Sequence, residues 1–282
     1  MSPRRIVAFL LAACICIATA AFLVAPVAQA APSARTYPLH TRIVTTTFWV
    51  GEIFDPTTPD GSQMISTYDG QWFAHYGGCD GVNRGSGAKK CQTEKRTAAN
   101  GFYPTSMIPK ENPFYLDLPF DDLNDPSGYR QRGKTIPWAN DPGYAGKAQD
   151  PNFSLMKNRW VQLTRAGSTC YGQIQDAGPA DEESGGRYDD AAYVFGANDF
   201  RPLNKEFGGA GMDVSPALTG CLNLRDLDGI SPGDLSWRFV EAANVPAGPW
   251  TKIVTTSQVD GAASSAEYKA TIVPPSARGG RS

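Results

Sequence analysis

A hairpin that ends in an acidic turn gives this chain its strongest local structural signal. Residues 159–165 and 169–175 are rich in β-branched and aromatic side chains, and Ala166-Gly167 between them is typical of a hairpin turn. The second predicted strand runs into Asp176-Ala-Gly-Pro179, a composition that favours a turn. The pattern therefore predicts an antiparallel strand pair with a carboxylate at its end.

A second acidic segment, Gly211-Met-Asp-Val-Ser-Pro216, precedes a short helix predicted over residues 216–224. Asp213 and Ser215 are both candidate N-caps, and a cap of this kind stabilises a helix start by about 0.5–2 kcal/mol. The sequence leaves open whether Asp213 serves the helix or a chemical reaction. Asp176 has a similar alternative, because an Asp before Ala-Gly-Pro also closes an Asx-turn.

Composition limits the class of protein. Glycine and proline are abundant, at 29 and 22 of 282 residues, and long segments with a helical period are scarce. This predicts a mainly β protein. The formal net charge of −2 argues against a nucleic-acid partner. The chain has only two histidines and no Cys-x-x-Cys spacing, so we expect no metal site and no cofactor.

The amino-terminal segment has the features of a secretory signal peptide. Arg4 and Arg5 precede an apolar run over residues 6–24, and Ala28-Gln29-Ala30 fits a cleavage site. We therefore expect residues 1–30 to be removed, giving a secreted protein, extracellular or associated with the cell wall, without stable membrane insertion. Two alternatives stay open: an uncleaved anchor, and a lipoprotein attached at Cys14, although the apolar run continues past that cysteine.

The cysteines agree with export. Cys14 and Cys16 lie in the expected signal peptide, which leaves Cys79, Cys91, Cys170 and Cys221 of the six. An even number in an exported chain suggests two disulfides, with three possible connectivities. We favour Cys79–Cys91 as a local clip and Cys170–Cys221 as a long-range bridge.

The rest of the chain divides into one expected domain with flanking segments. Further strands are predicted over residues 42–54, 63–68, 113–118, 235–242 and 250–256. We expect a flexible lead-in over 31–41, a single domain over 42–260 and a disordered tail over 261–282. Within the domain, residues 77–95 form a glycine-rich loop closed by cysteines, and 119–158 are an inserted loop region, either functional or ornamental.

Several motifs occur in the order of a known barrel family. Asp176-Ala-Gly-Pro179 is followed by Asp213-Val-Ser215 and then by Trp237-Arg-Phe-Val240. Upstream, Ser66-Thr-Tyr-Asp-Gly70 precedes Gly77-Gly-Cys-Asp-Gly81. This arrangement resembles the double-psi β-barrel of expansins, small single-barrel endoglucanases and the rare lipoprotein A type of lytic transglycosylase. The likeness covers about residues 63–256, apart from 119–158. It implies a mainly β fold, a six-stranded double-psi β-barrel with long loops and one or two short helices.

The resemblance implies a polysaccharide-cleaving site. Asp213 matches the position of the general acid in the related endoglucanases and transglycosylases. Asp69 follows Tyr68 much as the endoglucanase base follows its strand aromatic, so Asp69 is the candidate base. An inverting hydrolase needs both groups, roughly 6.5–9.5 Å apart, whereas a lytic transglycosylase needs no base that activates water.

Two departures from the family pattern remove imidazoles. Gly211-Met212 stands where endoglucanases and expansins carry His-Phe before the Asp. Asn100 follows Thr97-Ala-Ala99 where the lipoprotein A group carries a histidine, and an amide does not exchange protons near neutral pH. An expansin-like role tolerates these changes better than catalysis does.

The remaining candidate residues are possible sugar contacts. Aromatic rings suit the flat faces of sugars, although core packing is their more frequent use. The candidates are Tyr68, Trp72, Tyr76, Asn100, Tyr103 and Asp176. Asp117 is expected to be an exposed strand residue rather than one that faces the groove, and His75 a structural or surface histidine rather than a proton shuttle.

Two function classes follow. The first is a secreted, expansin-like monomer that binds, loosens or cleaves cell-wall polysaccharide or peptidoglycan, as a glycoside hydrolase or lytic transglycosylase if it is an enzyme. The second is a non-catalytic extracellular module that binds glycan or protein through the same groove. An Asp213 bound entirely to its own helix start favours the second class.

Overall fold

The computed structural model describes residues 35–54, 63–83, 91–180, 186–225, 227 and 230–259. The expected signal peptide over 1–30 and the expected tail over 261–282 lie outside these residues. The chain from Thr36 onward forms one compact unit, which is the unit described below.

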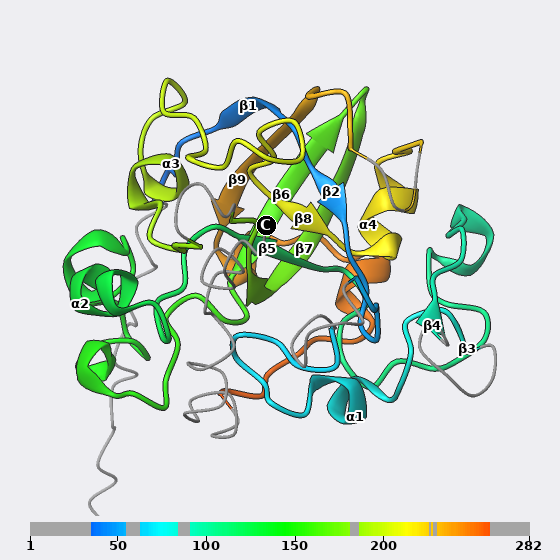
Figure 1. Ribbon diagram of the computed structural model, residues 1–282, viewed down its shortest axis with the longest axis horizontal. Helices are drawn as coiled ribbons and strands as arrows, with labels where there is room; N and C mark the ends of the chain where they lie inside the picture. Colours follow the sequence, from blue (N-terminus) through cyan, green and yellow to red (C-terminus); the bar gives the residue numbers. More distant parts are fainter. Residues whose placement is uncertain are drawn as a thin grey trace, which may run out of the picture. The chain divides into compact units, whose positions relative to one another are not determined.

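The fold is mainly β, as predicted, with one curled sheet of seven strands and a second sheet of two (Figure 1). The order in the large sheet is β1-β9-β6-β7-β5-β8-β2. Its strands are β1 (His40–Ile43), β2 (Thr46–Thr47), β5 (Tyr115–Leu118), β6 (Trp160–Arg165), β7 (Ser168–Ala177), β8 (Asp213–Val214) and β9 (Leu235–Val240). The small sheet pairs β3 (Val82–Asn83) with β4 (Cys91–Gln92).

The predicted hairpin forms the centre of the large sheet. β6 and β7 pair antiparallel, with Arg165 opposite Ser168. Ala166 and Gly167 have φ angles of 47° and 84°. Positive φ at both loop positions is what a two-residue hairpin turn with the right-handed strand twist requires. The strands predicted over 113–118 and 235–242 are also confirmed, as β5 and β9.

The two ends of the strand order meet in the sequence. β1 pairs with β9 and β2 pairs with β8, yet only Val44 and Thr45 separate β1 from β2. Two pairs in the sheet are parallel, β2 with β8 and β5 with β7, and the others are antiparallel. The curl of the sheet thus brings its first and last strands close to one another.

Helices are few and short. They are α1 (Trp72–Tyr76), α2 (Pro126–Thr135), α3 (Ala191–Phe195) and α4 (Pro216–Cys221), with 3-10 turns η1 (Ala98–Asn100), η2 (Lys147–Gln149), η3 (Ala242–Asn244) and η4 (Pro249–Thr251). α2 and α3 lie on one side of the large sheet, and α4 lies on the opposite side in the same view (Figure 1). The predicted helix at 216–224 is confirmed as α4. Its N-cap is Ser215, whose Oγ accepts from the Leu218 N–H at 3.3 Å.

The prediction that residues 119–158 are loop is wrong, because they contain α2. Asp125 caps this helix and Pro126 occupies its first turn. Arg132 of α2 is fully buried, and its guanidinium holds the surrounding chain together. It donates to the carbonyls of Asp122, Lys147, Ala148, Asp150 and Phe153. The five donors of an arginine thus satisfy backbone groups of an otherwise irregular segment.

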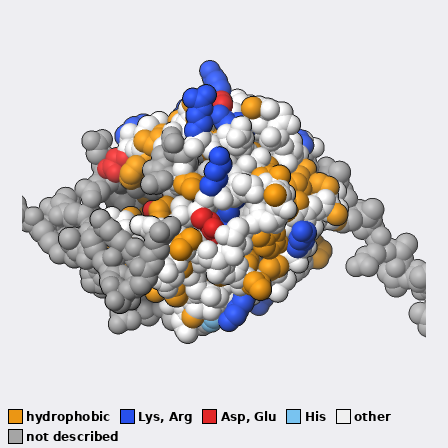
Figure 2. Space-filling model, turned by 90° about the vertical axis from the view of Figure 1, so that its right-hand side faces the viewer, with side chains coloured by type: hydrophobic (Ala, Val, Ile, Leu, Met, Phe, Trp, Pro, Cys, Tyr) orange, Lys and Arg blue, Asp and Glu red, His pale blue; other side chains and the backbone are white. Residues whose placement is uncertain are grey.

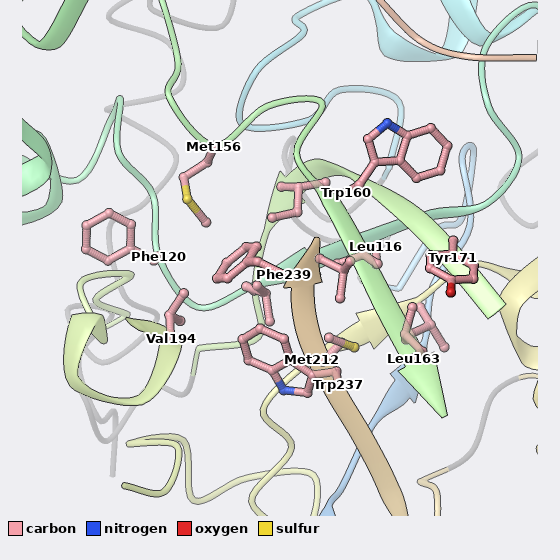
Figure 3. Close-up of a cluster of buried hydrophobic side chains, with 14 of the residues drawn as sticks. Leu116, Phe120, Met156, Trp160, Leu163, Tyr171, Val194, Met212, Trp237 and Phe239 are labelled. Carbon is pink, nitrogen blue, oxygen red and sulfur yellow. The ribbon is translucent and has the colours of Figure 1, made fainter. Parts of the chain in front are cut away.

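The main core lies on the concave side of the large sheet. Figure 3 shows Leu116, Leu163, Trp237 and Phe239 converging from β5, β6 and β9. Trp138 from the inserted segment joins them, with its ring 4.8 Å from that of Phe239. The inserted segment is therefore packed into the domain rather than laid over its surface.

Both expected disulfides are present. Cys79–Cys91 closes the glycine-rich loop beside β3 and β4, and Cys170–Cys221 joins β7 to the end of α4. Disulfides of this kind suggest an oxidising, extracellular environment. In the part of the chain that the structure describes, no helix is long and apolar enough to span a membrane.

Three sequence-based expectations are wrong. Residues 63–68 form turns with a single bridge between Ser66 and Asp69, since Ser, Asp and Gly favour turns over an extended ladder. The strand expected over 250–256 is η4 followed by irregular chain. The expected flexible lead-in contains a buried residue, because Tyr37 packs edge-on against Trp138 and Phe239. β1 already begins at His40.

Candidate functional site

Three carboxylates meet on adjacent strands of the large sheet. Asp117 on β5 lies opposite Asp213 on β8 and beside Asp176 on β7. The backbone N–H of Asp213 donates to Asp117 Oδ1 at 2.9 Å. The motifs around Asp176 and Asp213 are therefore brought together in space, with Asp117 between them.

The expectation that Asp117 is exposed is wrong. Only 4% of the residue is accessible, and its neighbours on β5 are buried as well. A central strand covered on both faces loses the inside–outside alternation on which the expectation rested. Gly178 makes room for the carboxylate, since a Cβ at this position lies 2.7 Å from Asp117 Oδ2.

Burial raises the pKa of all three carboxyl groups, and repulsion by neighbouring carboxylates raises those of Asp117 and Asp213 further. Burial, then the charges of Asp213 and Asp176, hold the pKa of Asp117 well above its usual range. Burial and then Asp176 raise the pKa of Asp213 to about 7, against a backbone hydrogen bond from Thr46. Burial raises the pKa of Asp176 to about 6, against hydrogen bonds from Thr67 and Ala177. Near neutral pH the cluster therefore retains at least one proton.

Asp213 is the most exposed member of the cluster. Asp117 and Asp176 are 4% and 6% exposed, whereas Asp213 is only partly buried. Its Oδ1 is inaccessible and has no hydrogen-bond partner among the described residues. Asp213 does not cap α4, because it lies in β8 and Ser215 takes that role. The structure thus excludes the capping of α4 as the role of this residue.

Tyr188 lies close to the same cluster. Burial, followed by the charges of Asp176 and Asp117, raises the pKa of this tyrosine above its usual value. Two hydrogen bonds fix its backbone: the Tyr188 N–H donates to the Asp125 carboxylate, and the Tyr188 carbonyl accepts from the Asp121 N–H. Sequence reasoning missed Tyr188, and no local pattern marks it, because it reaches the cluster from a long connection between β7 and α3.

Asp176 also fastens a loop to the sheet. Its Oδ1 accepts from the N–H of Thr67 and from that of Ala177, each at 2.8 Å. The Thr67 carbonyl in turn accepts from Asn124 Nδ2 at 2.9 Å. These bonds give Asp176 a positioning role and leave its buried carboxylate little contact with solvent.

Asp69, the predicted base, belongs to a different group of residues. Its Oδ1 accepts from the Gln71 N–H at 2.8 Å, and its Oδ2 is 2.7 Å from His75 Nδ1. Its charge contributes to the raised pKa of Glu111, after burial of that group. Asp69 lines a pocket of about 530 Å³ together with His75 and Glu111. The structure thus pairs Asp69 with His75 rather than with Asp213.

The predicted aromatic sugar contacts are mostly core residues. Tyr68, Trp72 and Tyr76 are at most 1% exposed. Trp72 and Tyr76 pack edge-on against Tyr115, so their rings offer no face to a sugar. Tyr68, Trp72 and Tyr76 were expected to contact sugar, but the structure shows that they pack in the interior instead.

Asn100 and Tyr103 organise a loop near η4. Asn100 Nδ2 donates to the Tyr103 carbonyl at 2.7 Å, and the Tyr103 hydroxyl donates to the Pro249 carbonyl at 3.0 Å. The Tyr103 ring packs against Phe114 and under the Lys252 ammonium. These contacts explain both residues without a ligand.

No group of three or more His, Cys, Asp or Glu residues in the described part of the chain is arranged to hold a metal ion. The raised pKa values make Asp117, Asp176 and Asp213 a proton-holding cluster. Comparison of the chain with protein-family models, with curated proteins and with solved structures finds no match in any of the three.

Proposed function

We propose that the large sheet is a closed, six-stranded double-psi β-barrel. Counting β1 and β2 as one bent strand reduces the seven strands to six, arranged in a ring. The Thr46 N–H donates to the Met212 carbonyl and the Phe48 N–H to that of Val214, so residues 46–48 continue the pairing with β8. The two parallel pairs are related through the antiparallel contact of β5 and β8, which supports two interlocked psi motifs.

We propose that the protein is secreted and cleaves cell-wall polysaccharide, with Asp213 as general acid. The observation that carries this proposal is the state of the Asp213 carboxyl group. It is partly exposed, is not engaged as a helix cap, and has a pKa raised to about 7. A carboxylic acid that keeps its proton near neutral pH is what protonation of a glycosidic oxygen requires.

A lytic reaction fits the cluster better than an inverting hydrolysis. Asp117 lies directly opposite Asp213, but at 4% exposed it is too buried to activate a water or to attack the sugar as a nucleophile. Asp69 is held by His75 and serves another pocket. A reaction with a single acid is therefore favoured.

The lytic reaction needs only Asp213 to move a proton. Protonated Asp213 donates to the glycosidic oxygen as the bond from the anomeric carbon to that oxygen breaks. A hydroxyl of the same sugar then attacks the anomeric carbon and returns its proton to Asp213. Asp176, whose pKa is raised only to about 6, holds negative charge beside the positively charged transition state near neutral pH, and no water is consumed.

The surface is compatible with an uncharged polymer. On the face shown in Figure 2, Lys and Arg side chains are interspersed with apolar and uncharged ones rather than gathered into one patch. Polysaccharide or peptidoglycan remains the partner that the proposal assigns.

The test is product release from insoluble polymers. Wild type, Asp213→Asn and the exposed control Asp199→Asn are incubated with peptidoglycan, cellulose, xylan and chitin, and soluble products are identified by mass spectrometry. We expect wild type and the control to release products with an internal anhydro ring, and Asp213→Asn to release none. Binding by all three proteins without any product instead assigns the non-catalytic, expansin-like role, and neither binding nor product on any polymer overturns both.

A further inference from the structure

A second polar pocket lies beside α1, apart from the three-carboxylate cluster. Its volume of about 530 Å³ falls in the range of roughly 300–1,000 Å³ that is usual for small-molecule sites. It is lined by Asp69, Ala74, His75, Lys110, Glu111, Ser257, Gln258 and Val259. These residues come from three parts of the chain, which meet only in the folded structure.

Glu111 gives this pocket an unsatisfied polar group. The residue is 8% exposed, and its Oε1 accepts from the Ser257 hydroxyl at 3.1 Å. Its Oε2 is buried and has no hydrogen-bond partner among the described residues. A buried carboxyl oxygen left unpaired costs free energy, so a ligand that supplies a partner binds favourably here.

His75 is held in a fixed orientation on the pocket wall. Its Nδ1 donates to Asp69 Oδ2 at 2.7 Å, while 40% of its side chain is exposed. Asp69 is itself fixed by the Gln71 N–H. The hydrogen bond to Asp69 thus fixes the orientation of the imidazole at the pocket wall.

A buried lysine holds the opposite wall. Lys157 is 2% exposed, and its Nζ donates to the Ser257 hydroxyl and to the Gln258 carbonyl, each at 3.2 Å. Its positive charge also opposes the rise in the pKa of Glu111 that burial causes. The segment that closes the pocket is thus tied down before any ligand arrives.

The charges around the pocket nearly cancel. Asp69, Glu111 and Lys110 all line the pocket, and the charge of Lys157 acts on Glu111, so a free cation or a free anion meets a like charge as well as an opposite one. A neutral ligand with several hydroxyl groups avoids this repulsion, and hydroxyls both donate and accept. Ala74 and Val259 add small apolar surfaces on which the C–H face of a ring can rest.

We propose that this pocket is a second carbohydrate-binding site, which takes a neutral sugar unit through the unpaired carboxyl oxygen of Glu111, with His75 forming part of its wall. The choice of polymer rests on the proposed function, whereas the pocket stands on its own contacts. The Ser66–Asp69 bridge loop connects the two sites, because Thr67 is bound to Asp176 and Asp69 lines the pocket. The pocket therefore anchors a chain whose cleavage occurs at Asp213.

Binding of soluble oligosaccharides tests the proposal. The hexasaccharides of cellulose, xylan and chitin, and soluble peptidoglycan glycan strands, are titrated into the intact protein by calorimetry. We expect at least one to bind, and Glu111→Ala and His75→Ala each to weaken that binding by about tenfold or more, as the loss of a buried hydrogen bond predicts. Glu206→Ala, outside the pocket, is the matched control and is expected to bind as wild type does.

The outcomes separate this site from the catalytic one. Asp213→Asn is expected to bind the oligosaccharide like wild type while releasing no product. If wild type releases product and both pocket variants bind the oligosaccharide as wild type does, the pocket proposal alone is overturned. If the pocket variants lose binding but wild type releases no product, the catalytic role alone is overturned. The pocket proposal also fails if no oligosaccharide binds, or if inorganic phosphate or ethylamine binds more tightly than every sugar. Thermal unfolding of both pocket variants is measured in parallel. His75→Ala alters a partly exposed side chain and is expected to fold, so it still tests the pocket if Glu111→Ala does not fold.

Discussion

Asp117 and Asp213 face each other across β5 and β8, and the backbone N–H of Asp213 donates to the Asp117 carboxylate at 2.9 Å. The two side chains cannot both ionise without strong repulsion, so one proton is held between two strands that the sequence places far apart. This relationship links the stability of the folded protein to the acidity of Asp213, the proposed general acid.

Replacing Asp117 by Asn is expected to stabilise the protein at neutral pH. Burial raises the pKa of Asp117 above its unfolded value near 3.8, so the folded state resists ionisation and the penalty grows as pH rises above that value. Asn keeps an oxygen for the Asp213 N–H and carries no charge. We expect the free energy of unfolding in urea to rise by at least about 1 kcal/mol at pH 7 and to change little at pH 3. A variant that is less stable than wild type at pH 7 contradicts this account of the cluster.

Cleavage is expected to decline as pH rises through about 7, because Asp213 loses the proton that it donates. Asp213→Asn is expected to lower the rate by about 10²–10⁴-fold at pH 6, the usual contribution of a general acid. The measurement is the initial rate of product release between pH 5 and pH 9. A rate that stays constant to pH 9 removes Asp213 from this role.

Gly178→Ala is expected to disturb the cluster by contact. The added methyl group lies 2.7 Å from Asp117 Oδ2, which forces the carboxylate or the backbone to move. Overpacking of this kind costs about 1–3 kcal/mol. The informative control is the double variant with Asp117→Ala, which removes the clashing group, so the two changes together are expected to cost less than their sum. Additive effects in denaturant unfolding indicate that the clash is relieved elsewhere.

The two disulfides are expected to contribute unequally. Cys170–Cys221 spans 51 residues and Cys79–Cys91 spans 12, and a longer closed loop restricts the unfolded chain more. Removing each pair by alanine substitution is expected to cost about 1 kcal/mol more for Cys170–Cys221 in the chain-entropy model. Unfolding curves of the two double variants make the comparison, and a larger loss for the short loop excludes this explanation.

His40 is expected to make the fold sensitive to acid. It is buried and stacks on Trp237 at 4.2 Å, and burial, with Arg201 nearby, lowers its pKa from 6.5 to about 4. Between about pH 6.5 and pH 4, His40 is protonated in the unfolded chain but neutral in the folded one, so stability is lost as pH falls through this range. In His40→Leu the free energy of unfolding is expected to fall less over this window. Because all other groups are unchanged, the difference between variant and wild type at each pH isolates His40, and a difference that does not vary with pH sinks the assignment.

Local signals in the sequence predicted local structure well. The β6–β7 hairpin, α4 and both disulfides follow from turn residues, a cap and cysteine spacing, which act over a few residues or leave few alternatives. α2 also had such a signal in Asp125-Pro126, a cap followed by proline at the first helical position, and the abundance of Asp, Pro and Gly around it concealed that signal.

The candidate site was predictable only in part. Asp213 and Asp176 were identified from their motifs, but Asp117 was assigned to the surface because alternation along β5 gave no sign that both faces are covered. Asp69 was paired with Asp213 by analogy, and its real partner, His75, lies six residues further along the chain, in α1. Burial and partners of this kind depend on tertiary packing, which a single sequence does not encode in any short window.

The pairing of β1 and β2 with strands far along the chain affects how the protein folds as it is synthesised. These strands pair with β9 and β8, so neither can be placed until residues 213–240 exist. Folding that depends on such distant contacts is intrinsically slow. A nascent chain of this design leaves β1 and β2 unpaired until residues 213–240 have been made, and Cys170–Cys221 cannot close before Cys221 has been added.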